Sequence, residues 1–185
     1  MATPIDILLE EHRLIERATK VLLVVGAKME RGEPVPPDSF EQIFDFLDSF
    51  ADRRHHGKEE RCLFPALATH GVQRDRGPVG IMLQEHCSGR ALIAHMKRAA
   101  AQYEQSAANA GRRFAEHARD YTALLTEHID KEDNVLFRIA QSLLDEPAML
   151  TLQAEFDRME PDRAAAFERY KSELGEMELA WIKAA

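Results

Sequence analysis

The chain has 185 residues, of which 45% are hydrophobic and 30% are charged, and its formal net charge at pH 7 is −8. This length suits one domain with a hydrophobic core, and the 7% share of aromatic residues, with few glycines and prolines, favours a helical globular protein. The negative charge argues against nucleic acid as a partner, because binding to phosphates requires clustered lysine and arginine side chains.

The cysteines and the apolar stretches bear on the compartment. Cys62 and Cys87 form neither a disulfide framework nor a C-x-x-C motif, which favours a reducing compartment. No uninterrupted apolar run approaches the roughly 20 residues that span a bilayer, and the N-terminus lacks the apolar stretch of a secretory signal. We therefore expect a cytoplasmic protein that does not enter a membrane.

Four long helices are expected in the first three quarters of the chain, because apolar residues recur there at helical spacing. The first covers residues 4–29, and the proline-rich stretch RGEPVPPDS follows it. The second covers residues 38–70 and ends at a glycine. The third covers residues 81–105, after the turn RDRGPVG, and the fourth covers residues 109–144.

Two shorter helical segments follow. Pro147 and Pro161 bracket the first, and residues 162–183 form a final amphipathic segment. Long helices with short connections favour antiparallel packing. We therefore predict an all-α fold, with an antiparallel, up-and-down four-helix bundle over residues 1–146 and a C-terminal helical extension over residues 147–185 packed on it. The extension is also a candidate surface for a homodimer contact.

The second and fourth helices share a motif. Placing HHGKEERCLF over HIDKEDNVLF shows that both read H-x-x-K-E-[ED]-x-x-L-F. The alignment puts His55 on His128 and Glu59 on Glu132. Chance agreement at so many positions is improbable, so we expect the two helices to carry equivalent parts of one site.

The helical phase decides which members of the adjacent pairs in the second helix face the core. Residues advance by roughly 100° on a helix, so positions four apart share a face. His55 and Glu59 lie in the apolar stripe, whereas His56 and Glu60 fall toward its edge. On the fourth helix, His128 and Glu132 lie in a face that is otherwise almost entirely apolar. We therefore expect a histidine and a glutamate in the core on each of the two helices.

Buried glutamates must be paired or bound to a cation, because an unpaired ionised carboxylate in an apolar interior is too costly for a domain of marginal stability. Two helices that each carry His and Glu four positions apart resemble the paired motifs with which helical bundles bind two metal ions. A lone histidine on an apolar stripe is more often an ordinary core residue, so the doubled motif carries this prediction. The first and third helices add one centred histidine each. The predicted ligands are His12, His55, Glu59, His86, His128 and Glu132, with the glutamates bridging two cations.

These motifs also resemble a known family. The segments EHRLI, HHGKEERCLFP, EHCSGR and HIDKEDNVLF occur in the order found in the hemerythrin-like, or HHE cation-binding, family, and the resemblance covers roughly residues 4–145. It implies a four-helix bundle that holds two iron ions in a non-haem di-iron centre, with histidine end ligands, two bridging carboxylates and an oxo or hydroxo bridge. Mapped onto this sequence, it selects the same six ligands.

The sequence departs from the oxygen-carrying hemerythrins at two places. Those proteins have a second histidine four residues after the third-helix histidine, where this chain has Arg90. Their closing motif has a longer spacing from histidine to aspartate, whereas this chain has H-x-x-x-E. Both features are similar to the members with four histidines and two carboxylates, which include bacterial proteins linked to oxidative and nitrosative stress and to the repair of iron centres.

The resemblance therefore favours binding or reduction of a small oxidant, such as nitric oxide, peroxide or oxygen, at an open coordination position. Tyr121 is a candidate donor of a hydrogen bond or a proton, and His56 and Glu60 are candidates to orient ligands or carry protons. The alternative is a non-catalytic sensor or storage protein that binds oxygen or iron. The sequence does not decide whether the protein is an enzyme, such as an oxidoreductase that acts on peroxide or nitric oxide.

Overall fold

The computed structural model describes residues 2–105 and 108–183, and their regular secondary structure is entirely helical, which confirms the predicted all-α class. Among these residues, no helix is both long enough and apolar enough to cross a membrane. The helical segments are α1 (Pro4–Glu30), α2 (Pro37–Asp45), η1 (Phe46–His56), η2 (Glu59–Leu63), α3 (Phe64–Thr69), α4 (Gly77–Glu104), α5 (Ala110–Lys131), η3 (Glu132–Leu136), α6 (Phe137–Leu143), α7 (Glu146–Met159) and α8 (Arg163–Trp181).

Helical boundaries follow local sequence signals. Thr3 caps α1, because its hydroxyl accepts a hydrogen bond from the Asp6 amide at 3.1 Å while the Asp6 carboxylate accepts one from the Thr3 amide at 2.9 Å. The expected start of the third helix at residue 81 is wrong. Helix α4 begins at Gly77, because a proline in its first turn is compatible with a helix start.

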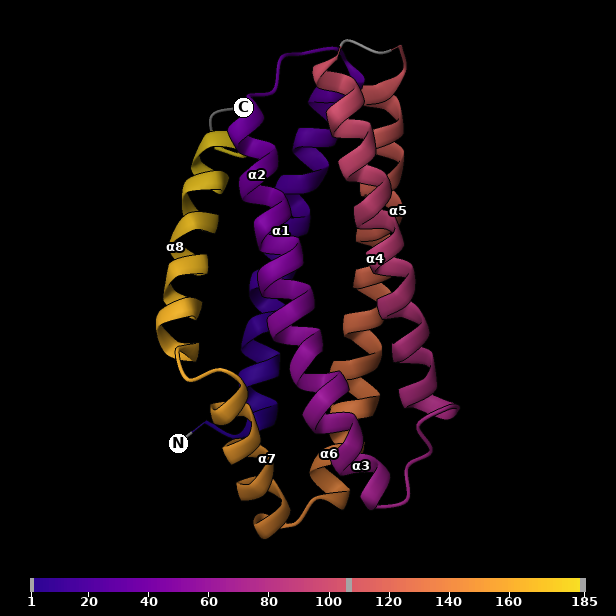
Figure 1. Ribbon diagram of the computed structural model, residues 1–185, viewed down its shortest axis with the longest axis vertical. Coiled ribbons are helices and arrows are strands. Elements are labelled where there is room, and N and C mark those ends of the chain that lie inside the picture. The colour runs from indigo at the N-terminus through magenta and orange to yellow at the C-terminus, as the bar shows by residue number, and fades with distance from the viewer. Residues whose placement is uncertain (1, 106–107, 184–185) are drawn as a thin grey trace.

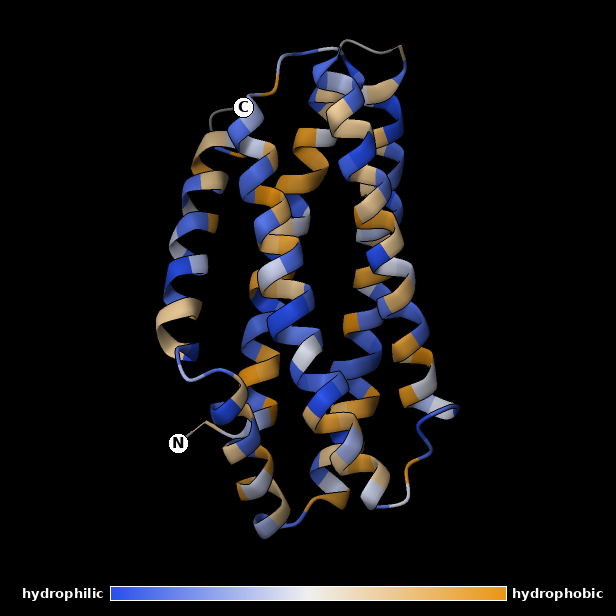
Figure 2. Ribbon diagram, viewed as in Figure 1, coloured by the Kyte–Doolittle hydropathy of each residue, from blue (hydrophilic) through white to orange (hydrophobic). Residues whose placement is uncertain are grey.

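The helices form an elongated bundle (Figure 1). Helix α1 starts at the lower end of the view, the segment from α2 to α3 returns downward, α4 rises again, and the segment from α5 to α6 descends. Helix α5 packs along both α1 and α4. Each long helix carries hydrophobic and hydrophilic residues along its length (Figure 2), as expected of helices with one face toward a core.

Parts of the second and fourth long segments have the wider π-helical turn. These parts are η1, η2 and η3, and each copy of the repeated motif lies partly on them. In a π-helix the backbone bonds join residues five apart, so side chains do not keep the angular spacing of an α-helix. Such turns are frequent at functional sites. They also mean that a phase of 100° per residue does not hold through this part of the chain.

The apolar core has two parts with a polar layer between them. One part extends from Leu14 on α1 toward the connection of α4 and α5, and the other gathers around Leu8, Leu63 and Phe137 at the opposite end of the bundle. His12 lies between Leu8 and Leu14 in the sequence of α1. Hydrophobic side chains on both sides along the bundle axis therefore separate the polar layer from solvent.

The C-terminal helices contribute to both parts of the core. Tyr170 on α8 packs on Phe46 and Phe50, with ring centroids 5.9 and 5.1 Å apart, and Phe156 on α7 lies in the other part. Glu178 on α8 also accepts two hydrogen bonds from Arg17 on α1, at 2.8 and 2.9 Å. These contacts join α7 and α8 to α1, while the division into residues 1–146 and 147–185 and the homodimer contact stay predictions.

Candidate metal centre

The polar layer contains two groups of buried side chains whose ligand atoms converge. Within each group the ligand atoms lie within 4.8 Å of one another. The first group is His12, His55, Glu59 and Glu132, and the second is His56, Glu59, His86 and His128. The structure thus brings all six predicted ligands together and adds His56. Glu59 belongs to both groups.

Both glutamates lie between the groups. The two oxygens of Glu59 lie 3.5 Å from Nε2 of His55 and 3.4 Å from Nε2 of His86. A single oxygen of Glu132, Oε2, lies 3.1 Å from Nε2 of His12 and 3.3 Å from Nε2 of His128. Each carboxylate therefore faces one histidine from each group, which is the placement that a ligand shared by two cations requires.

The centre leaves polar atoms without hydrogen-bond partners. Among the described residues, none donates a hydrogen bond to either oxygen of Glu59 or Glu132, and Nε2 of His12 and of His55 is also unpartnered. All four side chains are almost completely buried. Buried charges and lone pairs of this kind are compensated in proteins by pairing or by metal coordination. Imidazole nitrogen and carboxylate oxygen are donors that suit first-row transition metals, so the residues fit a metal centre.

A second set of carboxylates fixes the histidines. Nδ1 of each imidazole faces a carboxylate, which leaves Nε2 directed at the interior of the centre. The pairs are His12 with Asp133 (2.6 Å), His55 with Glu11 (3.0 Å), His86 with Glu60 (2.8 Å), His128 with Glu85 (2.9 Å) and His56 with Asp52 (3.4 Å). Of these carboxylates only Glu60 is among the residues predicted from the sequence.

The repeat extends to this second set. Asp133 directly follows Glu132 and Glu60 directly follows Glu59, whereas Glu11 and Glu85 directly precede His12 and His86. The dipeptide E-H, present in both EHRLI and EHCSGR, is therefore the sequence signal that identifies Glu11 and Glu85.

The phenylalanines of the repeat are equivalent as well. Phe64 stacks on His86 with ring centroids 6.0 Å apart, and Phe137 stacks on His12 at 5.4 Å. Each repeated motif thus contains two of the predicted ligands, His and Glu. It also holds the histidine of α1 or α4 with a carboxylate and a phenyl ring.

His56 does not lie at the edge of the site, where the α-helical phase predicts it. It is 5% exposed, and its ring stacks on that of His86 with centroids 3.9 Å apart. Both His55 and His56 end the π-helical segment η1, whose wider turn changes the direction of its side chains. In the second motif the residue equivalent to His56 is Ile129, so this additional imidazole occurs in one half of the repeat.

The close packing of buried histidines and carboxylates shifts their pKa values in the absence of metal. Burial raises the pKa of Glu59, and the neighbouring Glu132 raises it further. Burial by itself lowers the pKa of His12, but its hydrogen bond with Asp133 and the negative charge of the nearby Glu132 raise it to about 10. Burial lowers the pKa of His55 and of His56 well below the usual value. Protonated His12 therefore balances part of the carboxylate charge, while neutral His55 and His56 keep a free lone pair.

Tyr121, the predicted hydrogen-bond donor, is 1% exposed. Its hydroxyl has no hydrogen-bond partner among the described residues. Its ring lies beside Gly89 of α4, since a Cβ at Gly89 would be 3.6 Å from the ring carbon Cε2. Burial raises the pKa of this hydroxyl, which therefore keeps its proton.

A family comparison bears on the nature of the centre. The sequence profile described as the Hemerythrin HHE cation binding domain matches residues 3–140. The chain belongs to the hemerythrin HHE cation-binding domain family. No curated protein matches the chain. Family membership and the two histidine–carboxylate groups together identify the polar layer as a metal-binding site.

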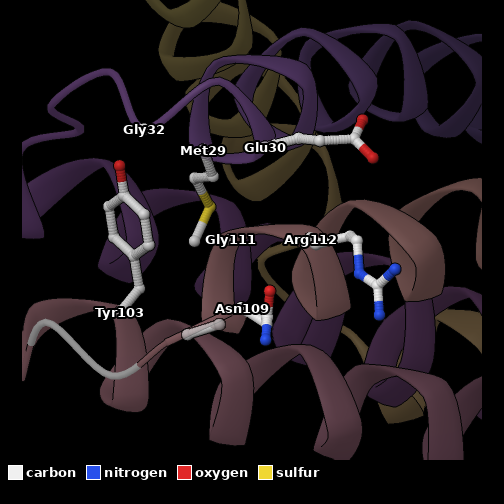
Figure 3. A pocket seen from close by; sticks show the side chains of 8 residues that line it. Met29, Glu30, Gly32, Tyr103, Asn109, Gly111 and Arg112 are labelled. Carbon is white, nitrogen blue, oxygen red and sulfur yellow. The ribbon is translucent and has the colours of Figure 1, made fainter.

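The hemerythrin-family centre is distinct from the surface pockets. One pocket of about 520 Å³ is lined by Met29, Tyr103, Gly111, Arg112 and their neighbours, and Figure 3 shows these side chains around it. Met29 lies about 25 Å from His12 along α1 at the rise of an α-helix. This pocket therefore contributes nothing to the metal centre.

Replacing Glu59 by glutamine tests the centre through stability. We expect Glu59→Gln to raise the melting temperature of the metal-free protein by about 2–8 °C, because the substitution removes an uncompensated buried charge. The same variant should lose the stabilisation that added metal gives to the wild-type protein. Thermal unfolding with a chelator and with Fe²⁺ or Co²⁺ measures both effects.

The exposed Glu41, on the same helical segment, provides the control Glu41→Gln, which should behave like the wild type in both conditions. A Glu59→Gln protein that keeps the full metal-induced rise in melting temperature would contradict the assignment of Glu59 as a shared ligand.

Proposed function

We propose that this chain is a non-haem di-iron protein that binds or reduces a small oxidant, such as nitric oxide, peroxide or oxygen. The supporting observation is the pair of buried histidine–carboxylate groups that share Glu59. The proposed role is protection against oxidative or nitrosative stress, or repair of iron centres, in the cytoplasm. We also infer that the four ligand-bearing segments form the antiparallel, up-and-down four-helix bundle expected from the sequence.

The donor atoms suggest how two iron ions are held. His12 and His55 would hold one ion, His56, His86 and His128 would hold the other, and both glutamates would bridge them. The group of His12 and His55 would then offer fewer histidine donors than the other group, which would leave room for a small oxidant on that side. When bound, the two irons supply the electrons that reduce such an oxidant.

The protein's own residues would control access and protons. The ligands lie between two apolar clusters and are nearly inaccessible to water, which favours an uncharged diatomic molecule or a peroxide over a larger substrate. The unpartnered hydroxyl of Tyr121 is available to donate a hydrogen bond into the interior. Glu60 accepts hydrogen bonds from His86 and Arg90, which lower its pKa to about 2, so it acts as a fixed anion that orients His86.

One observation favours the alternative, a sensor or storage protein that binds oxygen or iron without turnover. One departure of the sequence from the oxygen-carrying hemerythrins is the absence of a fifth histidine from the third helix. His56 supplies a fifth imidazole from the second helix instead. Arg90, which occupies the third-helix position, donates hydrogen bonds to Asp52 at 2.8 Å and to Glu60 at 2.6 Å. The donor set therefore allows reversible binding as well as reduction.

Anaerobic loading with iron separates these functions. We expect about two irons per chain and, on addition of nitric oxide or hydrogen peroxide, consumption of the oxidant with a change in the optical spectrum. A stable oxygen adduct that reverses under vacuum would instead identify the binding protein. Fewer than about two irons per chain would contradict the di-iron proposal itself.

His56→Ile gives the first motif the residue that the second motif has at this position. If His56 is a ligand, we expect the variant to bind one of the two Co²⁺ ions at least about 10-fold more weakly and to show an altered visible Co²⁺ spectrum. His95→Ala, which removes an exposed histidine, is the control. An unchanged spectrum and unchanged affinities in His56→Ile would show that His56 is only a neighbour of the ligands.

A further inference from the structure

Lys58 is a completely buried lysine, 0% exposed, between the two ligands His55 and Glu59 in the sequence. Its ammonium group contacts two carboxylates. One is Glu11 on α1, with Nζ 2.9 Å from Oε1, and the other is Glu160, in the connection between α7 and α8. A buried lysine needs such partners, because an uncompensated ammonium in the interior is strongly disfavoured.

Glu11 links this ammonium to the metal centre. Its oxygen Oε1 faces Lys58, while its other oxygen, Oε2, lies 3.0 Å from Nδ1 of His55. The position of Lys58 therefore determines where the Glu11 carboxylate lies, and this carboxylate determines the orientation of the His55 ring. A continuous series of polar contacts joins Glu160, Lys58, Glu11 and His55.

The second copy of the motif makes the same series of lysine, glutamate and histidine contacts, but its lysine has no described partner equivalent to Glu160. Lys131, the equivalent of Lys58, contacts Glu85, whose carboxylate also faces Nδ1 of His128. The Lys131 side chain is 35% exposed, and its described ion pair is with Glu85. Water can therefore stabilise the Lys131 ammonium, whereas the Lys58 ammonium depends on protein groups.

The difference arises from the C-terminal extension. Glu160 is 5% exposed and lies outside residues 3–140, the part of the chain that matches the family. Arg54 donates to Glu160 at 2.7 Å and to Asp162 at 3.0 and 3.1 Å, which fixes this connection on η1. Figure 1 shows the turn from α7 to α8 beside the bundle rather than beyond its end. The extension thus closes one side of the centre with a charged group.

We propose that Glu160 is a positioning residue for the metal centre, which holds Lys58 against Glu11 and thereby orients His55 for metal binding. This inference rests on the proposed di-metal function. It assigns to the extension a role at one metal ion, the one on the side of His12 and His55. Because coupling between two sites is reciprocal, metal binding stabilises the docked position of α7 and α8 in return.

Titration of the metal-free, full-length protein with Co²⁺ tests the proposal. We expect Glu160→Gln to bind one of the two Co²⁺ ions about 10-fold more weakly and to leave the affinity for the other within about twofold. Glu160→Asp, which keeps the charge, should recover most of the loss. The matched control is Asp162→Asn, since Asp162 shares Arg54 with Glu160 but makes no contact with Lys58.

The number of Co²⁺ ions bound and the effect of the variants distinguish a failure of the proposed di-metal function from a failure of the positioning role of Glu160. A wild-type protein that binds fewer than two Co²⁺ ions contradicts the proposed di-metal function. A wild-type protein that binds two, with a Glu160→Gln variant that binds both equally well, contradicts the positioning role alone. An equal loss of affinity in Asp162→Asn would also contradict it, since a general loosening of the connection would then explain the effect.

Hydrogen exchange provides a readout that does not depend on a variant folding. In the wild-type protein, Co²⁺ should slow amide exchange in residues 156–166, which cover the end of α7, the connection and the start of α8, as reciprocal coupling requires. Exchange in this connection that is the same with and without bound Co²⁺ would overturn the proposal.

Discussion

The burial of two carboxylates, Glu59 and Glu132, is the constraint on which the rest of the centre depends. Neither has a hydrogen-bond donor among the described residues, and each faces histidines from both groups. Their charge needs cations, the cations need imidazole lone pairs, and those imidazoles need carboxylates on their opposite nitrogens. Water cannot solvate these charges instead, because apolar clusters surround the centre on both sides.

A repeat of two halves meets this constraint, and two differences between the surroundings of the halves bear directly on the centre. His56 adds an imidazole where the second half has Ile129, and Glu160 closes the contacts of Lys58 where Lys131 reaches solvent. Both differences concern the first motif. The two histidine–carboxylate groups are thus chemically unequal. In the proposed di-iron centre, this inequality suits one ion that receives an oxidant and another that assists.

Much of the fold was predictable, because helical periodicity and proline-rich interruptions are local signals. The convergence of the six predicted ligand residues could be foreseen as well, because a doubled H-x-x-x-E motif on apolar faces leaves few other interpretations. The position of His56 could not, since the phase was counted on an α-helix and η1 has a wider turn. The role of Glu160 could not be predicted for another reason. It contacts Lys58, which is 102 residues away in the sequence, and no periodicity links the two positions.

Anomalous X-ray scattering at the iron edge, from crystals of the iron-loaded protein, tests the central claim most directly. We expect two iron peaks in the polar layer, about 3.5–4 Å apart, with the Glu59 carboxylate within bonding distance of both. A single peak, or two peaks of which only one lies next to Glu59, would contradict the shared-carboxylate centre.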